Sequence, residues 1–314
     1  MKIGLIDVDG HNFPNLPIMK LSAWHKARGD TVEWYQPMFS GHMDRVYMSK
    51  VFSFTPDYEY IVDADEVIKG GSGYCIELVD GKEVYHAERD HNLPYEIEHI
   101  YPDYDLYGIT DTAYGFMSRG CPRKCDFCHV KAKPADGPRA RKVADLSEFW
   151  RWQKEIKLLD PNPIACKEWR DILQQLADSN AYVDFIQGVD IRIMTEEKAE
   201  MLRKIKVKLV HFAFDRFQDW DIVVPRLNTF AQVTGWKRNK VSVYVLVNFD
   251  TTLDQDLARI YAIRKAGFQP YVMVYDKTHL PKGSIYYKLQ RWCNNSIVFW
   301  KCKRFEDYDR RKYG

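Results

Sequence analysis

Residues 118–128 of this 314-residue chain read Ser-Arg-Gly-Cys-Pro-Arg-Lys-Cys-Asp-Phe-Cys. The three cysteines, Cys121, Cys125 and Cys128, are separated by three residues and then by two, so one short loop can turn three thiolates towards a compact metal centre. An iron–sulfur cube is usually held by four cysteines, and three would leave one iron open to another ligand. Because structural metal sites are normally closed by protein ligands, an open position indicates chemistry rather than structural support.

Two other interpretations of the cysteine loop are open. A structural zinc site needs a fourth ligand, and His129 could supply it, but His129 is adjacent to Cys128 and no second Cys-x-x-Cys pair is present. Three unrelated free thiols would be the other explanation. The remaining four cysteines are scattered along the chain, and we interpret Cys75 and Cys293 as ordinary thiols.

The composition indicates a folded chain. Hydrophobic residues make up 46% of it, enough for a sizeable core. The formal net charge of +2 argues against a general nucleic-acid coat. No apolar run approaches the ~20 residues that span a bilayer, and the first residues lack the features of a signal peptide. We therefore expect a cytoplasmic protein without membrane contact, whose clustered cysteines are reduced and act as metal ligands.

Strand-like and helix-like segments alternate around and beyond the loop. A strand at 113–117 leads into it, and further strands are expected at 156–160, 183–190, 209–215, 241–247 and 271–275. Helical patterns are found at 146–153, 169–177, 196–205 and 253–266. The alternation predicts parallel strands in a partial (β/α)6 TIM-type barrel over residues 109–280. Polar residues end the strands, at the rim where such barrels carry active sites: Asp160, Gln187, Asp190, Asp215, Asn248 and Asp276.

Residues 1–108 predict a separate, smaller domain. Strands are expected at 2–8, 31–35, 45–52, 60–62 and 66–68, with a helix at 16–27. Strand, helix and strand joined by short glycine loops indicate a Rossmann-like (flavodoxin-like) parallel α/β domain. The tyrosine-rich passage 79–107 has no clear period and is expected to be a linker. Residues 281–314 form a basic and aromatic C-terminal extension.

The cysteine loop and its context resemble the radical S-adenosylmethionine (SAM) superfamily over roughly residues 110–280. The family signature CxxxCxxC matches Cys121, Cys125 and Cys128, and Phe127 occupies the usual aromatic position, where it is expected to contact SAM. The resemblance implies that the cysteines hold a [4Fe–4S] cluster whose fourth iron binds SAM. It also implies that one electron, supplied by an external carrier of the flavodoxin or ferredoxin type, cleaves SAM to a 5′-deoxyadenosyl radical. That radical would abstract hydrogen from a substrate, which no rim residue identifies.

The resemblance implies further SAM contacts, with departures from the family pattern. Residues 159–163, Leu-Asp-Pro-Asn-Pro, replace a Gly-Gly-Glu-like segment. Asp160 is expected to bind the SAM ammonium or, alternatively, to cap the next helix. Gln187 and Asp190 fall where the family contacts the ribose and the carboxylate of SAM. Arg192 is expected to pair with the SAM carboxylate or to lie on a solvated rim.

The N-terminal domain resembles the cobalamin-binding (B12-binding) domain that precedes many radical SAM barrels. That domain carries Asp-x-His-x-x-Gly after its first strand, and the histidine ligates cobalt in some members. Asp9 and His11 match the motif, but Pro14 replaces its glycine, and proline fixes φ and lacks the N–H. We therefore expect a degenerate domain that packs on the barrel without cobalamin. A cobalamin-dependent radical SAM methyltransferase is the alternative.

Two basic segments indicate further partners. The proline-containing loop 131–142 directly follows the cysteines, so it could cover the site or meet an acidic substrate or reductase; a solvated connection is the simpler interpretation. The extension 281–314 interleaves aromatic and basic residues, a pattern that can bind nucleic acid. The favoured interpretation is that its aromatics pack against the barrel. A non-catalytic iron–sulfur or nucleic-acid-binding protein is thus the rival to an enzyme.

Overall fold

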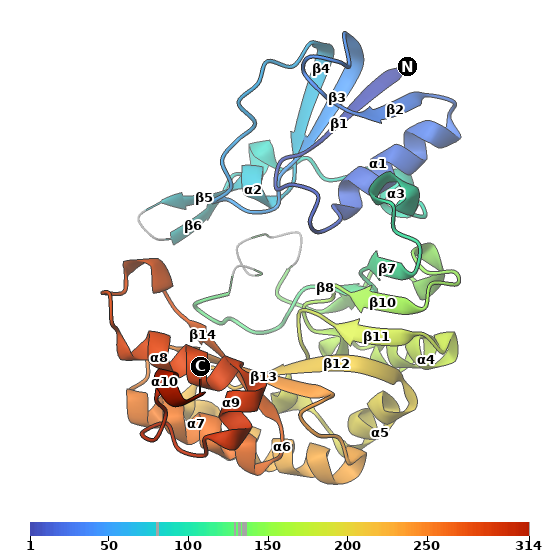
Figure 1. The fold of residues 1–314 in the computed structure, drawn as a ribbon. Coiled ribbons are helices and arrows are strands. Elements are labelled where there is room, and N and C mark those ends of the chain that lie inside the picture. The colour runs from blue at the N-terminus through green and yellow to red at the C-terminus, as the bar shows by residue number, and fades with distance from the viewer. Residues whose placement is uncertain (80–81, 129, 131–132, 134–136, 314) are drawn as a thin grey trace. The chain divides into compact units, whose positions relative to one another are not determined.

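A computed structural model describes residues 1–79, 82–128, 130, 133 and 137–313 of the chain (Figure 1). The chain divides into two compact units, Met1–Ile156 and Lys157–Gly314. The domain boundaries expected after residues 108 and 280 stay predictions.

The first unit begins with a four-stranded parallel sheet in the order β2-β1-β3-β4. Its strands are β1 (Lys2–Asp7), β2 (Thr31–Trp34), β3 (Met43–Ser49) and β4 (Ala64–Gly70). β1 pairs in parallel with β2 and β3, and β3 pairs in parallel with β4. Helix α1 (Leu16–Ala27) connects β1 to β2, and the side chain of Asn15 caps it by accepting from the Ile18 N–H. The expected parallel α/β sheet is therefore confirmed.

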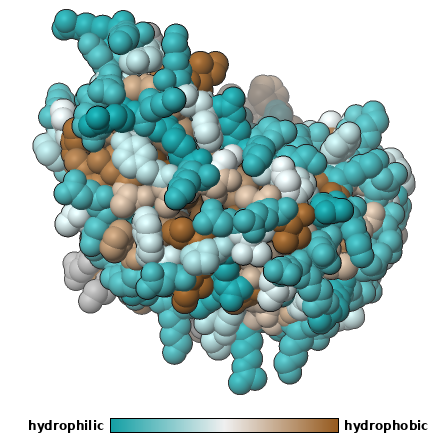
Figure 2. Space-filling model, turned by 90° about the horizontal axis from the view of Figure 1, so that it is seen from below, coloured by the Kyte–Doolittle hydropathy of each residue, from teal (hydrophilic) through white to brown (hydrophobic). Residues whose placement is uncertain are grey.

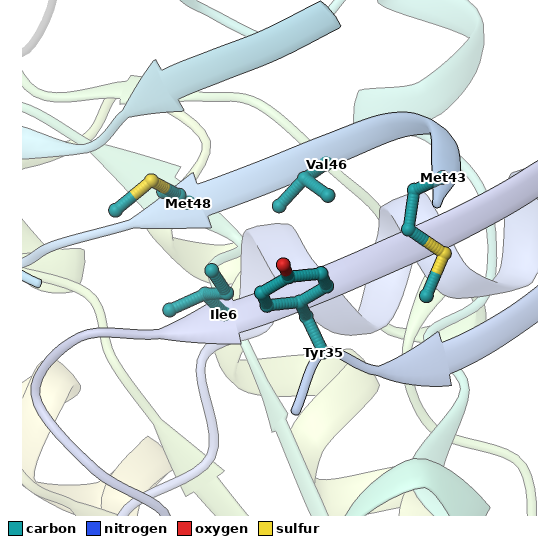
Figure 3. Close-up of a cluster of buried hydrophobic side chains, with 5 residues drawn as sticks. All are labelled: Ile6, Tyr35, Met43, Val46 and Met48. Carbon is teal, nitrogen blue, oxygen red and sulfur yellow. The ribbon is translucent and has the colours of Figure 1, made fainter. Parts of the chain in front are cut away.

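Both faces of this sheet are covered. Figure 3 shows a buried cluster formed by side chains of β1, β3 and the residue after β2: Ile6, Tyr35, Met43, Val46 and Met48. A second cluster joins Ile3 and Leu5 of β1 to Ile18 of α1. Because successive side chains of a strand point to opposite faces, Leu5 and Ile6 serve different clusters. Burial on both faces is usual for a parallel sheet and explains the apolar run that begins the chain.

The tyrosine-rich passage contains short elements that its pattern did not predict. β5 (Ile76–Val79) and β6 (Lys82–Tyr85) form an antiparallel hairpin after α2 (Ser72–Cys75), followed by η1 (Ala87–Arg89), α3 (Tyr95–Glu98) and η2 (Tyr104–Tyr107). Elements this short show no period, and contacts distant in sequence hold them: the Tyr107 hydroxyl donates to Asp7 at 2.7 Å. The strand expected at 60–62 is wrong, because β4 begins only at Ala64 and Ile61 is exposed.

A six-stranded sheet contains the strands expected for the barrel. They are β7 (Thr112–Gly115), β10 (Glu155–Leu158), β11 (Tyr182–Phe185), β12 (Lys206–Ala213), β13 (Val241–Val247) and β14 (Gln269–Val274). Each strand lies beside its neighbour in this series, and the pairs from β11 to β14 are parallel. The predicted series of strands is thus confirmed, and closure into a partial barrel stays a prediction.

Parallel strands need long crossovers, which helices supply: α4 (Trp169–Ser179), α5 (Glu196–Lys204), α6 (Trp220–Thr234) and α7 (Leu253–Lys265). The sequence did not predict α6, which carries Pro225 in its interior, where proline is unfavourable. The helix expected at 146–153 is wrong, since only one turn forms, η5 (Leu146–Glu148). The Gln153 side-chain oxygen accepts hydrogen bonds from the backbone N–H groups of Arg151 (3.0 Å) and Trp152 (3.3 Å). These N–H groups are therefore not used in helical hydrogen bonds.

The C-terminal extension covers the edge strand β14. It forms α8 (Ile285–Asn294), α9 (Ser296–Lys301) and α10 (Arg310–Tyr313). The Asn294 side chain accepts from the Val272 N–H at 2.7 Å and donates to the Val272 carbonyl at 3.0 Å, so it satisfies the open edge of the sheet. Trp292 and Phe299 are fully buried. These aromatics pack as expected, and nucleic-acid binding by the extension stays a prediction.

The described helices include none with the length and apolar character needed to cross a membrane. Figure 2 shows hydrophilic residues over most of the face that is seen from below in Figure 1, with hydrophobic residues in small groups between them. Scattered apolar residues of this kind are normal on protein surfaces.

Candidate functional site

The cysteine loop is closed at its base by a two-stranded ribbon. β8 (Ser118–Arg119) pairs antiparallel with β9 (Arg141–Lys142), and Arg119 lies opposite Arg141. Just outside the ribbon, the Met117 carbonyl accepts from the Val143 N–H at 2.8 Å. Both arms of the loop therefore start from one ribbon, which follows shortly after β7 in the chain.

The three cysteines are partly exposed, and none forms a disulfide. The Cys128 N–H donates to the Cys125 carbonyl at 3.1 Å, so a tight turn joins them. Burial raises the pKa of the Cys128 thiol, and the charges of Cys125 and Cys121 raise it further. The turn thus brings the backbones of Cys125 and Cys128 together.

Three cysteines on one loop fit an iron–sulfur cluster by donor type, because such clusters are held by thiolates. In the part of the chain that the structure describes, no three metal-binding side chains converge on one point, so the thiols would have to rotate to enclose a cluster. His129, the fourth ligand of the zinc interpretation, lies outside the described residues. Phe127 is partly exposed within the loop.

Asp160 lies two residues beyond β10 and is only 2% exposed. The interpretation that it caps the next helix is wrong. Asn162 precedes the following turn, η6 (Pro163–Ala165), and Glu168 precedes α4. Asp160 interacts with other groups of the chain, and its place just beyond the end of a strand is the edge at which parallel sheets bind ligands.

Gln187, Asp190 and Arg192 follow β11. Gln187 is exposed, whereas Asp190 caps the short helix η7 (Ile191–Ile193). Asp190 accepts from Arg192 Nε at 2.8 Å, and Arg192 Nη1 donates to Asp219 at 2.9 Å. Burial lowers the pKa of Arg192, but the two carboxylates outweigh burial and raise it overall. Arg192 is thus held by protein carboxylates, and its partner Asp219 carried no signal in the sequence.

Asp215 and Arg259 tie the ends of β12 and β13 together. The Asp215 carboxylate accepts from the Leu246 N–H at 2.9 Å. Its burial raises the pKa to about 6, against the opposing effects of that bond and of Arg259. Arg259, fully buried on α7, donates to the carbonyls of Phe214 and Leu246 and pairs with Asp256. The sequence indicated Asp215 as a rim residue, but nothing in it distinguishes Arg259 from a surface arginine.

A histidine and two tyrosines share one face of the second unit's sheet. His211 stacks on Tyr244, with ring centroids 4.7 Å apart and planes inclined by 4°, and Tyr271 meets Tyr244 edge-on. Burial lowers the pKa of His211, and its Nδ1 has no hydrogen-bond partner among the described residues. His211 alternates with the buried Phe212 along β12. This alternation of side chains between the two faces of the strand is the sequence pattern that could have indicated His211.

Asp9 and His11 lie at the carboxyl edge of the N-terminal sheet. The Asp9 carboxylate accepts from the Thr55 hydroxyl at 2.6 Å, which joins the loops that follow β1 and β3. His11 is exposed, and its ring lies over Trp34 with centroids 4.1 Å apart. In sheets of this order, ligands bind where the connections from neighbouring strands diverge, here between β1 and β3.

No protein-family model matches the chain, and no curated protein matches it in sequence. Among solved structures, the chain is similar to the radical SAM methyltransferase TsrM from Kitasatospora setae, which holds cobalamin and a [4Fe–4S] cluster. The TM-score is 0.57 and the identity 10%, and the similarity covers 87% of this chain and 74% of that chain. The uncovered part is far shorter than residues 1–108, so the similarity extends into the N-terminal sheet.

At this identity the similarity is one of fold. The chain has a mixed α/β architecture with parallel sheets, shared with a radical SAM enzyme. TsrM holds cobalamin. The shared fold therefore does not support our expectation that this chain lacks cobalamin.

Proposed function

We propose that the chain is a radical SAM enzyme whose Cys121, Cys125 and Cys128 hold a [4Fe–4S] cluster. The observation that carries the proposal is the position of the cysteines, in one closed loop shortly after the first strand of a sequentially ordered six-stranded sheet. The fold shared with a radical SAM methyltransferase supports it. When bound, the cluster supplies one electron that cleaves SAM to methionine and a 5′-deoxyadenosyl radical, which abstracts hydrogen from a substrate.

The residues of the chain bind and orient SAM in this proposal. Cys121, Cys125 and Cys128 would hold the cluster, and because they are only three they would leave a ligand position for the amino acid group of SAM. Asp160, buried beyond the end of β10, pairs with the SAM ammonium in a charge-assisted hydrogen bond. Gln187 and Phe127 contact the nucleoside part. Asp190 and Arg192 hold each other, so we assign them the role of positioning the turn after β11.

Anaerobic reconstitution with iron and sulfide tests the proposal. The protein should turn brown, and addition of SAM and dithionite should release 5′-deoxyadenosine, measured by chromatography. Asp160→Asn should weaken SAM binding about tenfold by removing a charge-assisted bond, whereas the exposed Asp178→Asn on α4 is the control. A protein that takes up no cluster refutes the proposal. An EPR spectrum that SAM leaves unchanged would favour an electron-transfer protein.

A cobalamin-dependent radical SAM methyltransferase is the second candidate. It is supported by the cobalamin in TsrM and by the exposed His11 imidazole at the carboxyl edge of the sheet, where it could ligate cobalt. Gly71, directly after β4, leaves little room for a cofactor tail. A Cβ placed on Gly71 would lie 2.3 Å from the Lys50 carbonyl oxygen, so this glycine accommodates the protein's own backbone.

Titration of the purified protein with hydroxocobalamin tests the second candidate. Retention of the cofactor on gel filtration, with an altered absorption spectrum, is expected if His11 ligates cobalt. His11→Ala should abolish the spectral change, while His42→Ala, another exposed histidine of the first unit, should preserve it. Absence of retention by the wild-type protein excludes this candidate and leaves the first untouched.

A further inference from the structure

A buried carboxylate joins the passage that contains the hairpin of β5 and β6 to the cysteine loop. The Asp90 side chain is only 3% exposed, and its Oδ1 lies 3.0 Å from Nζ of Lys133. Lys133 comes shortly after Cys128 in the sequence but long after Asp90. Two segments that are distant in the sequence therefore meet at one ion pair. We call Asp90 and Lys133 the anchor pair.

The position of Asp90 is set by the hairpin. The His86 N–H donates to the Cys75 carbonyl at 2.8 Å, which extends the antiparallel pairing of β5 and β6 by one step. The short helix η1 follows and leads directly to Asp90. The Tyr85 hydroxyl, at the end of β6, donates to the Asp90 carboxylate at 2.8 Å. The hairpin thus holds the carboxylate, and Lys133 is the partner that the cysteine loop supplies.

The anchor pair is more buried than an ordinary surface ion pair. Burial raises the pKa of Asp90, but the Tyr85 hydroxyl and Lys133 outweigh burial and lower it overall, so the carboxylate is charged at neutral pH. The Arg119–Glu98 pair at the base of the loop, at 3.4 Å, has side chains that are 31% and 35% exposed. Exposed pairs contribute little, whereas a buried charge that loses its partner is strongly unfavourable. Asp90 therefore holds Lys133 more firmly than a surface carboxylate would.

The anchor pair fixes a second point in the loop that carries the cysteines. The ribbon of β8 and β9 pairs Arg119 with Arg141, so the loop between these fixed ends is 120–140. Lys133 lies within this span, and all three cysteines precede it. The segment between fixed points that contains the cysteines is therefore shortened to 120–132. A shorter segment between fixed ends loses less conformational entropy when its side chains gather round one centre.

We propose that Asp90 positions the cysteine ligands of the cluster: by holding Lys133, it fixes the chain shortly after Cys128 and keeps the three thiols within reach of one centre. The inference rests on the proposed function, since a cluster at the cysteines needs its ligands together. Asp90 acts through Lys133 and contacts neither the cluster nor SAM, so it is a positioning residue. Residues that orient metal ligands without binding the metal commonly contribute about 10–100-fold to metal affinity.

Loss of iron from the reconstituted protein to a chelator tests the proposal without turnover. Lys133→Met removes the cation that Asp90 holds and should make iron loss about tenfold faster, whereas Lys133→Arg, which keeps the charge, should stay within about threefold of the wild type. The matched control is Lys26→Met. Lys26 pairs with another largely buried carboxylate of the first unit, that of Asp103 at 2.6 Å, and its replacement should change the rate less than about threefold.

The double variant Lys133→Met/Asp90→Asn separates positioning from stability. It leaves no unpaired buried charge, so its urea midpoint should exceed that of Lys133→Met, while its iron loss should be equally fast. Recovery of iron retention in the double variant would reduce the anchor pair to a stabilising contact and overturn the proposal. Wild-type iron loss in Lys133→Met, or an equal effect of Lys26→Met, would overturn it as well.

Thiol reactivity of the metal-free protein provides a measurement that does not depend on the cluster. Alkylation of Cys128 by iodoacetamide, followed by mass spectrometry, should become about threefold faster in Lys133→Met relative to Cys121, which closely follows β8, because a thiol reacts according to its exposure. An unchanged ratio would overturn the proposal even if the wild type takes up a cluster. Faster alkylation in Lys133→Met, with no cluster uptake by the wild type, would refute the proposed function and leave the positioning of the thiols intact.

Discussion

Gly115, at the end of β7, has only a hydrogen atom as its side chain, so the Phe149 ring can pack closely against it. A Cβ at this position would lie 2.2 Å from Cγ of the buried Phe149 ring. We expect Gly115→Ala to lower the free energy of unfolding by about 1–3 kcal/mol through overpacking. In a Phe149→Leu background, Gly115→Ala should lower the free energy of unfolding by a smaller amount. Urea unfolding of the four proteins of this double-mutant cycle measures the coupling, and simple additivity would contradict the clash.

Asp215 makes stability depend on pH. Burial raises its pKa from the ordinary value of 3.8 to about 6 in the folded protein, so the folded state binds more protons than the unfolded state between these values. The stability contributed by this carboxyl therefore falls as pH rises from about 4 to about 6 and is constant above. Asp215→Asn should become more stable than the wild type by about 1–3 kcal/mol above pH ~6, with a smaller difference near pH ~4. Urea unfolding at both pH values checks this, and a pH-independent difference would contradict the raised pKa.

At the scale of elements, Arg259 of α7 joins two strands of the sheet. It is fully buried and donates to a carbonyl beyond β12 and to the Leu246 carbonyl of β13, while Asp256 balances its charge. Arg259→Met should lower the free energy of unfolding by about 3–5 kcal/mol, because it leaves a buried carboxylate without its cation. Arg259→Met/Asp256→Leu should recover part of that loss. A double variant no more stable than the single one in urea unfolding would argue against a role for the unpaired charge.

At the scale of the whole molecule, the cysteine loop lies outside the buried clusters of the N-terminal sheet. Replacing Cys121, Cys125 and Cys128 by serine should abolish iron binding but leave the urea midpoint of the metal-free protein unchanged. A structural zinc site would behave differently, because removing the metal from the wild-type protein would itself lower the urea midpoint, since loss of a structural metal costs folding energy. The matched control is Cys293→Ser, which alters a fully buried thiol and should keep iron while lowering the midpoint. Iron analysis and urea unfolding distinguish the two cases.

Periodic patterns predicted long elements better than short ones. The apolar runs of β1 and β13 are continuous because these strands are largely buried. β12 instead alternates buried and more exposed residues, and the expected series of strands formed. The helix expected at 146–153 failed because the Gln153 side chain competes for backbone N–H groups. The hairpin of β5 and β6 escaped prediction because strands of four residues show too few alternations to reveal a period.

The sequence by itself determined the features that depend on neighbours in the chain. The spacing of Cys121, Cys125 and Cys128, and the alternation of strands with helices, are local and can be read directly. Only the tertiary structure decided the contacts between distant residues: Arg192 with Asp219, His211 with Tyr244, and the Phe149 ring over Gly115. Such pairs leave no local pattern, because packing of the folded chain selects each partner. The proposed cluster ligands therefore follow from spacing, while these distant pairs follow from the fold.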